Sequence, residues 1–151
     1  GAPYWDMYAR GTLVGMTRGT GRAHIIRAAL ESIAYQSAQL FDCMGKVCGT
    51  SPAALRVDGG ASANRFLMQF QSDILGVPVQ RPAVAETTAL GAALMAGLAL
   101  GVYSSLNDTA RGWHAAETLT PQMAAEEKDR LLAGWKKAVD AALCWAEMQK
   151  L

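Results

Sequence analysis

A short run of strand-forming residues ends in two glycines within the segment Leu55–Asn64, and this turn is the part of the sequence best suited to hold a ligand. Gly59 and Gly60 have no Cβ, so the backbone can adopt positive φ and a flat or charged ligand can approach it closely. The N–H groups in the first turn of the helix that follows would point toward that ligand. We expect Asn64 in this first turn, where its amide can both donate and accept hydrogen bonds.

The spacing around these glycines excludes two common phosphate motifs. No Lys-Ser or Lys-Thr pair follows them, so the segment is not a P-loop, and the three-glycine spacing of a dinucleotide fingerprint is missing. Asp-Gly-Gly also occurs as ordinary turn chemistry. On these residues alone, a plain strand-to-helix turn is the commoner interpretation and a nucleotide contact is the alternative.

The composition is that of a single globular domain. The chain has 151 residues, of which 51% are hydrophobic and 18% charged, and its net charge is +1. This balance gives no electrostatic reason to expect nucleic acid or an anionic membrane as a partner. The longest apolar run, Thr88–Val102, is short and interrupted by glycines, so we expect no membrane span.

Three cysteines, Cys43, Cys48 and Cys144, cannot all pair within the chain, which favours a reducing compartment. The first residues also lack the pattern of a signal peptide. We therefore expect a cytoplasmic protein. A zinc site is disfavoured because neither histidine stands at ligand spacing to the cysteines, and we interpret all three as ordinary buried thiols.

Helical and strand-like patterns alternate along the chain. Helical periodicity is expected over Arg22–Met44, Ser62–Leu75, Glu86–Leu100 and Thr120–Met148. Strands are expected over Thr12–Met16, Leu55–Asp58 and Val77–Gln80, and a polar loop over Ser104–Pro121. The pattern predicts an α/β fold with a small, mostly parallel sheet packed by long helices, and ligands in such sheets lie beyond the carboxyl ends of the strands.

Several residues carry more specific expectations. Pro78 cannot donate a ladder hydrogen bond, which favours an edge position for its strand. Gly91 and Gly97 lie inside an expected helix, which indicates close packing against another backbone. Thr120 and Pro121 are typical of an N-cap and a first helical position. The buried face of the first helix is expected to comprise Ile26, Leu30, Ile33, Leu40, Phe41 and Met44, with Gly45 ending the helix.

The sequence resembles the C-terminal half of glycerol kinases, within the carbohydrate-kinase superfamily. The resemblance is carried by Gly1–Asp6, Thr17–Gln36, Leu55–Ala61, Phe66–Gly76 and Thr88–Ala93, and it covers Gly1 to Gly101 with a weaker match at Gly134–Val139. The sequence departs from the family pattern at Met7, at Met95 and throughout Ser104–Pro121.

The resemblance implies an actin-like ATPase fold with ribonuclease-H-like domains, in which residues 1–151 form the C-terminal part of the second, nucleotide-binding domain. It implies transfer of the γ-phosphoryl group of Mg-ATP to glycerol. In the family, the second glycine of the pair and the asparagine four residues later contact adenosine, which corresponds to Gly60 and Asn64, and we add Gly59 to this ATP/ADP-binding set. Arg18 and Arg22 could hold phosphate, but we interpret them as solvated surface arginines.

The resemblance also implies what this chain does not supply. The catalytic base, the Mg²⁺ ligands, the phosphate hairpins and the glycerol pocket belong to the N-terminal half of such kinases, so no residue here is assigned a catalytic or metal-binding role. We expect the 151 residues alone to be inactive. Three interpretations stay open: part of a glycerol kinase, part of another sugar kinase, or a non-catalytic nucleotide-binding or oligomerisation module. An unpaired sheet edge and uncovered helix faces would favour a homo-oligomer.

Overall fold

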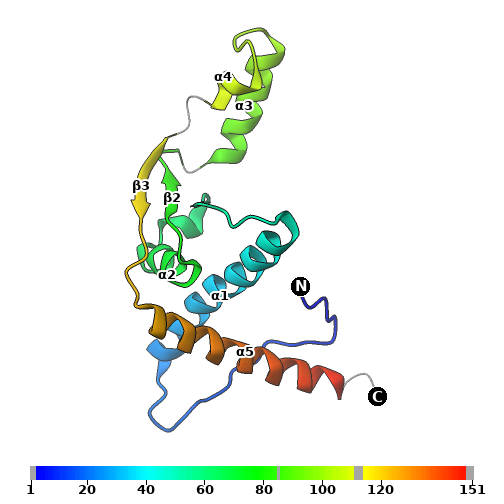
Figure 1. The fold of residues 1–151 in the computed structure, drawn as a ribbon, viewed down its shortest axis with the longest axis vertical. Helices are drawn as coiled ribbons and strands as arrows, with labels where there is room; N and C mark the ends of the chain where they lie inside the picture. Colours follow the sequence, from blue (N-terminus) through cyan, green and yellow to red (C-terminus); the bar gives the residue numbers. More distant parts are fainter. Residues whose placement is uncertain (1–2, 85, 111–113, 149–151) are drawn as a thin grey trace.

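A computed structural model describes residues 3–84, 86–110 and 114–148. In chain order the regular elements are α1 (Arg22–Cys48), β1 (Leu55–Arg56), the short 3-10 helix η1 (Gly60–Ala63), α2 (Arg65–Leu75), β2 (Val79–Pro82), α3 (Thr87–Ala99), α4 (Leu106–Ala110), β3 (Ala115–Leu119) and α5 (Ala125–Glu147). Figure 1 shows α1, α2 and α5 packed together below the sheet, with α3 and α4 extending from its other end.

The sheet has three strands in the order β1-β2-β3. β1 and β2 are parallel, with Leu55 opposite Val79, whereas β2 and β3 are antiparallel, with Val79 opposite Leu119. The expected α/β class is confirmed, and the parallel pair is joined through α2, but the sheet is mixed rather than mostly parallel because β3 pairs antiparallel to β2. The expectation that Pro78 marks an edge strand is wrong, because β2 is central. Pro78 lies just before the strand, so its missing N–H does not interrupt the ladder. Its carbonyl still joins β1 by accepting a hydrogen bond from Leu55 N at 2.9 Å.

Two expectations about strands were wrong. Thr12–Met16 forms no strand, and its apolar side chains Leu13, Val14 and Met16 are 49–58% exposed, because no described strand edge lies beside this segment to pair with it. Conversely, β3 and α4 lie within the segment that the sequence favoured as a polar loop. The part of that loop at Arg111–Trp113 lies outside the described residues.

Most helix ends lie close to the predicted positions, but α1 ends later and α5 begins later than predicted. Gly45 does not end α1, which continues to Cys48 and stops at Gly49 in the left-handed region (φ 68°). A Cβ on Gly45 would lie 3.6 Å from Thr50 O, so the chain folds back over this glycine. Gly76 (φ 72°) ends α2 as predicted.

The final helix starts later than predicted. Its N-cap is Ala124, so the assignment of Thr120 and Pro121 as N-cap and first helical residue is wrong. The chain is still extended at this point because β3 ends only at Leu119, and the connection is held against α2 by Asp73. The Asp73 Oδ1 atom accepts hydrogen bonds from the backbone N–H of Gln122 at 2.7 Å and of Met123 at 3.3 Å.

The core lies where α1, α2 and α5 meet the sheet. Tyr35 of α1 packs edge-on against Phe70 of α2 at 5.5 Å between ring centroids and stacks on Trp135 of α5 at 5.2 Å. Burial, followed by the charge of Glu31, raises the pKa of the Tyr35 hydroxyl to about 12. The buried apolar residues are Ala34, Tyr35, Leu67, Met68, Phe70, Ile74, Val79 and Leu119, with Ala146 buried separately.

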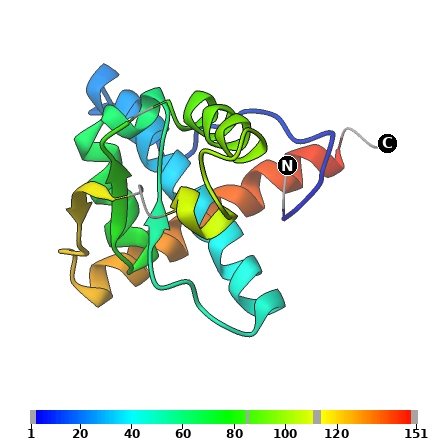
Figure 2. The same cartoon turned by 90° about the horizontal axis from the view of Figure 1, so that it is seen from above.

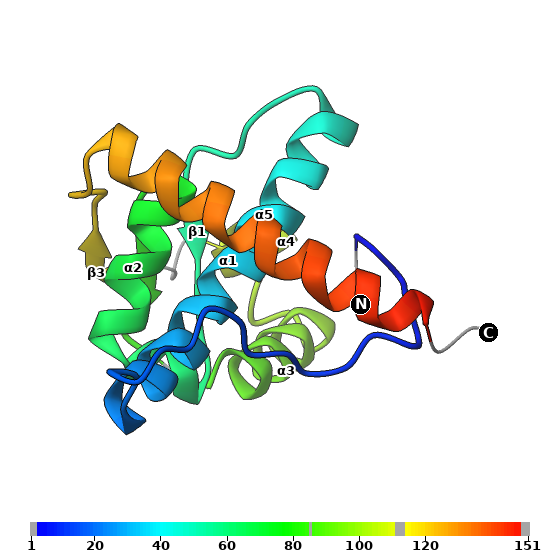
Figure 3. The ribbon, with the colours of Figure 1, turned by 90° about the horizontal axis from the view of Figure 1, so that it is seen from below.

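The buried stripe of α1 differs from the predicted one. Ala34 and Tyr35 are buried, but four residues of the predicted face, Ile26, Ile33, Leu40 and Met44, are 42–58% exposed. The helix packs on the core instead through Ala34 and Tyr35, with Ala38 partly buried beside them. Seen from below in Figure 3, α5 crosses over α1.

α3 is apolar along its whole length, yet none of its residues is buried. It packs mainly against α4, and Figure 1 shows the pair extending away from the core, so that in the view from above it lies in front of the other elements (Figure 2). Gly97 is closely packed, but against a side chain rather than the expected backbone, because its Cβ position would lie 2.8 Å from the Tyr103 ring. Close packing is not found at Gly91, which has nothing within 4 Å among the described residues.

All three cysteines are exposed and unpaired. The interpretation of Cys43, Cys48 and Cys144 as buried thiols is therefore wrong. Cys43 and Cys48 lie in the last turns of α1, beyond the part that packs on α2, and Cys144 lies on the outer side of α5.

Candidate functional site

The turn between β1 and α2 lies at the carboxyl end of β1, where the sequence analysis placed it. Pairing with β2 extends to Val57, whose N–H donates to Gln80 O at 3.0 Å. Gly59 then adopts φ 75° and ψ 177°, a conformation that essentially only glycine reaches without strain. Gly60 begins η1 without positive φ and is exposed, and no atom of the described residues lies within 4 Å of its Cβ position. The turn therefore presents bare backbone at Gly60.

Asn64 is the N-cap of α2 rather than part of its first turn, which corrects the predicted position. Its Oδ1 atom accepts a hydrogen bond from Leu67 N at 3.1 Å and so satisfies one N–H at the helix start. The side chain is exposed, and within the described part of the chain its Nδ2 group makes no hydrogen bond. Because the cap fixes the orientation of the amide, Nδ2 is a positioned donor.

Ser62 anchors the turn from inside. It is 4% exposed, and both its N–H and its hydroxyl donate to Gly59 O, at 3.1 and 2.7 Å. Its own carbonyl accepts from Arg81 Nη1 at 3.3 Å. The buried serine thus holds the inner side of the turn while Gly60 and Asn64 remain exposed on its outer side.

Sequence reasoning missed the residues behind this turn. Arg81 of β2 and Glu117 of β3 are opposite each other in the antiparallel register, and Arg81 Nη2 lies 2.6 Å from Glu117 Oε2. The other carboxylate oxygen, Oε1, lies 3.4 Å from Nε of Arg65, the first residue of α2. The only signal for this pair was the weak alternation of apolar and polar residues in Ala115–Leu119, which is too short to predict a strand beside β2.

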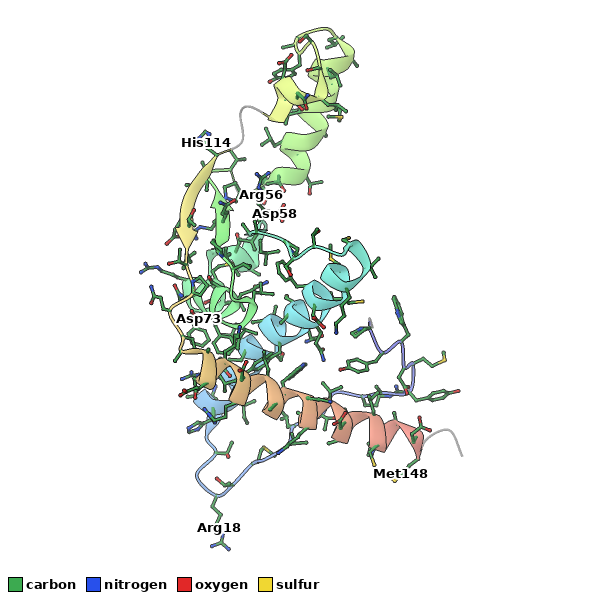
Figure 4. All side chains as sticks on the ribbon, viewed as in Figure 1. Arg18, Arg56, Asp58, Asp73, His114 and Met148 are labelled. Atoms are coloured by element: carbon green, nitrogen blue, oxygen red, sulfur yellow. The ribbon has the colours of Figure 1, made fainter. Side chains whose placement is uncertain are left out.

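A hollow of about 340 Å³ lies next to the turn, between the ends of β1 and β2 and the first turns of α3. Asp58 is part of its wall, and Figure 4 shows this residue near Arg56 at the base of α3. The hollow does not include Gly59, Gly60 or Asn64. The full lining is Arg56, Val57, Asp58, Pro82, Thr87, Leu90, Gly91 and Leu94.

Arg18 lies far from this region. It is exposed at the tip of the loop that precedes α1, and Figure 4 shows it at the bottom of the molecule, far from Asp58. Arg22, the first residue of α1, is also exposed. The structure therefore agrees with the interpretation of both as solvated surface arginines.

Neither a metal cluster nor a membrane span is found among the residues described. In residues 3–84, 86–110 and 114–148, no three His, Cys, Asp or Glu side chains come together in a group that could hold a metal ion. Over the same ranges, no helix combines the length and the apolar character that crossing a bilayer requires.

Comparison with known proteins identifies the family. The C-terminal domain of the FGGY family of carbohydrate kinases matches residues 1–100, which include the whole turn and α2. The chain belongs to the FGGY family of carbohydrate kinases. Within this family, the glycerol kinase of Symbiobacterium thermophilum is 62% identical over 146 residues, which are 97% of this chain and 29% of that protein. The glycerol kinase of Deinococcus radiodurans is 59% identical over 147 residues, or 97% of the chain and 29% of that protein.

Solved structures of FGGY kinases share the fold. Plasmodium falciparum glycerol kinase with ADP superposes with a TM-score of 0.83 at 35% identity, covering 94% of this chain and 28% of that one. Xylulose kinase from Rhodospirillum rubrum superposes with a TM-score of 0.77 at 27% identity, covering 94% of this chain and 29% of that one. The expected actin-like ATPase fold and the resemblance to the C-terminal part of glycerol kinases are confirmed.

The chain spans about 30% of the length of the curated relatives that it matches. The matches reach 97% of this chain, so they extend past Gly101 into the segment where the sequence resemblance was weakest.

Proposed function

We propose that this chain forms the adenosine-binding wall of an ATP-dependent glycerol kinase, which transfers the γ-phosphoryl group of ATP to glycerol. In this proposal residues 1–151 are the C-terminal part of the nucleotide-binding domain. The observation that carries it is the turn itself, with bare backbone at Gly60 beside the Asn64 amide, whose Nδ2 group makes no hydrogen bond to any described residue. Curated glycerol kinases at 55–62% identity support the choice of glycerol kinase within the FGGY family.

The exposed side of the turn fits an adenine nucleotide. A planar base can lie against Gly60 because no Cβ projects there, and the conformation of Gly59 brings the backbone into this position. The Nδ2 group of Asn64 can donate to a ring nitrogen while Oδ1 continues to cap α2. These contacts orient the nucleoside and leave its phosphates to other residues.

Phosphoryl transfer also needs groups outside this wall. It depends on Mg²⁺, a group that orients the attacking hydroxyl, and donors around the β- and γ-phosphates. We propose that the remaining part of the kinase supplies these groups together with the glycerol pocket, and that the 151 residues alone do not turn over substrate. Bound Mg²⁺ would neutralise the phosphate charge during transfer.

Calorimetry on the 151-residue chain tests the nucleotide site. ADP and ATP should bind equally and weakly, with a dissociation constant in the millimolar range, or on the order of −4 kcal/mol. No group of this wall distinguishes the γ-phosphate. Binding of ATP that is much tighter than binding of ADP would contradict the proposal, because it would require a phosphate site within this chain.

Another sugar kinase of the FGGY family is the second candidate function. Xylulose kinase structures share the fold, at 27% identity for the Rhodospirillum rubrum protein. The higher identity to curated glycerol kinases favours glycerol. Substrate preference of an assembled enzyme, with glycerol and xylulose supplied at equal concentration, separates the two candidates.

We also propose that the isolated chain self-associates in solution and that the kinase is cytoplasmic. The apolar side of α1 is open, as shown by Ile26 and Met44, which are 51% and 58% exposed. β1 pairs only with β2 among the described strands, so its other edge is free for a further strand. Light scattering after size exclusion should show species larger than a monomer, and a monomer at high concentration would contradict self-association.

A further inference from the structure

Three charged side chains on three different elements meet behind the turn that carries Gly60 and Asn64. Arg81 and Glu117 form a cross-strand pair at 2.6 Å, and Glu117 also faces Arg65 at 3.4 Å. The Arg81 and Glu117 side chains are 33% and 28% exposed, so solvent screens this pair less than the Lys46–Asp42 pair of α1, whose side chains are 75% and 66% exposed.

This group contacts the turn at one point, the carbonyl of Ser62. Arg81 donates to that carbonyl through Nη1 while Nη2 holds Glu117, so the planar guanidinium is fixed by two partners at once. Ser62 in turn binds Gly59 O through its N–H and its hydroxyl. A continuous set of polar contacts therefore runs from β3 through β2 to the residue that shapes the glycine turn.

Glu117 also reaches the far side of the turn. Its second oxygen faces Arg65, which directly follows the N-cap residue Asn64. The carboxylate thus lies between one arginine that holds Ser62 within η1 and another that begins α2. Glu117 is therefore linked to the Gly60–Asn64 surface at Ser62 through Arg81, and at the residue after Asn64 through Arg65.

We propose that Arg81 and Glu117 are positioning residues for nucleotide binding, which set the shape of the Gly60–Asn64 surface without touching the nucleotide. This inference rests on the proposed nucleotide site. Its physical basis is that a ligand held by bare backbone and one amide is sensitive to small displacements of both. The pair differs from a stabilising surface ion pair because one of its members donates to the turn.

The test uses the 151-residue chain and follows backbone amides by NMR. Arg81→Gln removes the ion pair and weakens the contact with Ser62, and Arg81→Lys keeps the charge but not the planar fork. In Arg81→Gln the amides of Ser62 and Asn64 should exchange with solvent about tenfold faster, and the dissociation constant for ADP should rise about three- to tenfold. Arg81→Lys should fall between this variant and the wild type.

Lys46→Gln is the matched control. It breaks the Lys46–Asp42 ion pair, which has the same 2.6 Å length but lies on α1 away from the turn. It should change neither amide exchange in the turn nor ADP affinity. If Arg81→Gln does not fold, Glu117→Gln replaces it, because this change preserves shape and removes only the charge.

The possible results are distinguishable. Failure of the unmutated chain to bind ADP would contradict the proposed function. In that case, faster amide exchange at Ser62 and Asn64 in Arg81→Gln would still show that Arg81 and Glu117 hold the shape of the turn. ADP binding that is unchanged in both Arg81→Gln and Glu117→Gln would overturn the inference. Equal exchange in Arg81→Gln and Lys46→Gln would also overturn it, because the pair would then act only as a surface ion pair.

Discussion

Replacing Gly59 by alanine should destabilise the protein, whereas the same replacement at the neighbouring Gly60 should not. Gly59 has φ 75° and ψ 177°, a region in which a Cβ costs about 1–3 kcal/mol. Gly60 does not have positive φ. No atom of the described residues lies within 4 Å of the Cβ position at Gly59 or Gly60, so backbone conformation is what separates the two variants.

The magnitude follows from comparing the two changes. Each replacement restricts the unfolded chain equally, a gain of about 0.4–1 kcal/mol that cancels between the variants. Gly59→Ala should therefore be less stable than Gly60→Ala by about 1–3 kcal/mol. For a chain of this length, this corresponds to a difference in melting temperature of about 2–12 °C.

Thermal unfolding of the two variants, followed by circular dichroism, provides the measurement. The wild type should lie between the variants, with Gly60→Ala slightly above it. Equal melting temperatures would refute the reasoning, because they would show that Gly59 is not held in the strained region. A lower melting temperature for Gly60→Ala than for Gly59→Ala would refute it more strongly.

Three further results are expected. In urea unfolding, Asn64→Ala should lose about 1 kcal/mol of stability because the helix cap is lost. Asn64→Asp keeps the cap, so it should weaken ADP binding and leave stability unchanged. Equal stability of the two variants would contradict the capping role. Ser72→Ala should lower the stability of the protein by about 1–3 kcal/mol, because the buried Ser72 hydroxyl lies 2.9 Å from Val77 O and 3.0 Å from Leu119 O. A change below about 0.5 kcal/mol in urea unfolding would contradict this prediction. Burial and Glu31 raise the pKa of Tyr35 to about 12, so the folded state keeps this proton to higher pH than the unfolded state does. Stability should therefore fall between about pH 10 and pH 12. Tyr35→Phe should remove this part of the fall, and an unchanged dependence of stability on pH in that variant would refute the assignment.

The sequence predicted the helices well because their signals are local. Asn64 and Gly76 bound α2 through side-chain capping and the left-handed conformation, both of which depend on residue type. The position of the glycine turn at the end of β1 followed from the same local chemistry. The structure added that Asn64 is the cap itself, so one side chain has both a structural and a proposed binding role.

The errors came from non-local pairing. β3 depends on pairing with β2, and Ala115–Leu119 has little strand propensity of its own. The buried stripe of α1 was predicted wrongly because periodicity shows which side is apolar but not what covers it. For the same reason, the Arg81–Glu117 pair could not be predicted, since 36 residues separate its members in the chain.

The most direct test of the central claim is the kinetics of a chimera in which these residues replace the matching segment of the Symbiobacterium thermophilum glycerol kinase. The chimera should phosphorylate glycerol, and the 151-residue chain alone should stay at background in the same ADP-release assay. Gly60→Val in the chimera should raise KM for ATP about tenfold or more and leave KM for glycerol within about twofold, because the branched side chain would occupy the adenine wall. An unchanged KM for ATP in Gly60→Val, or glycerol-dependent turnover by the chain alone, would contradict the account.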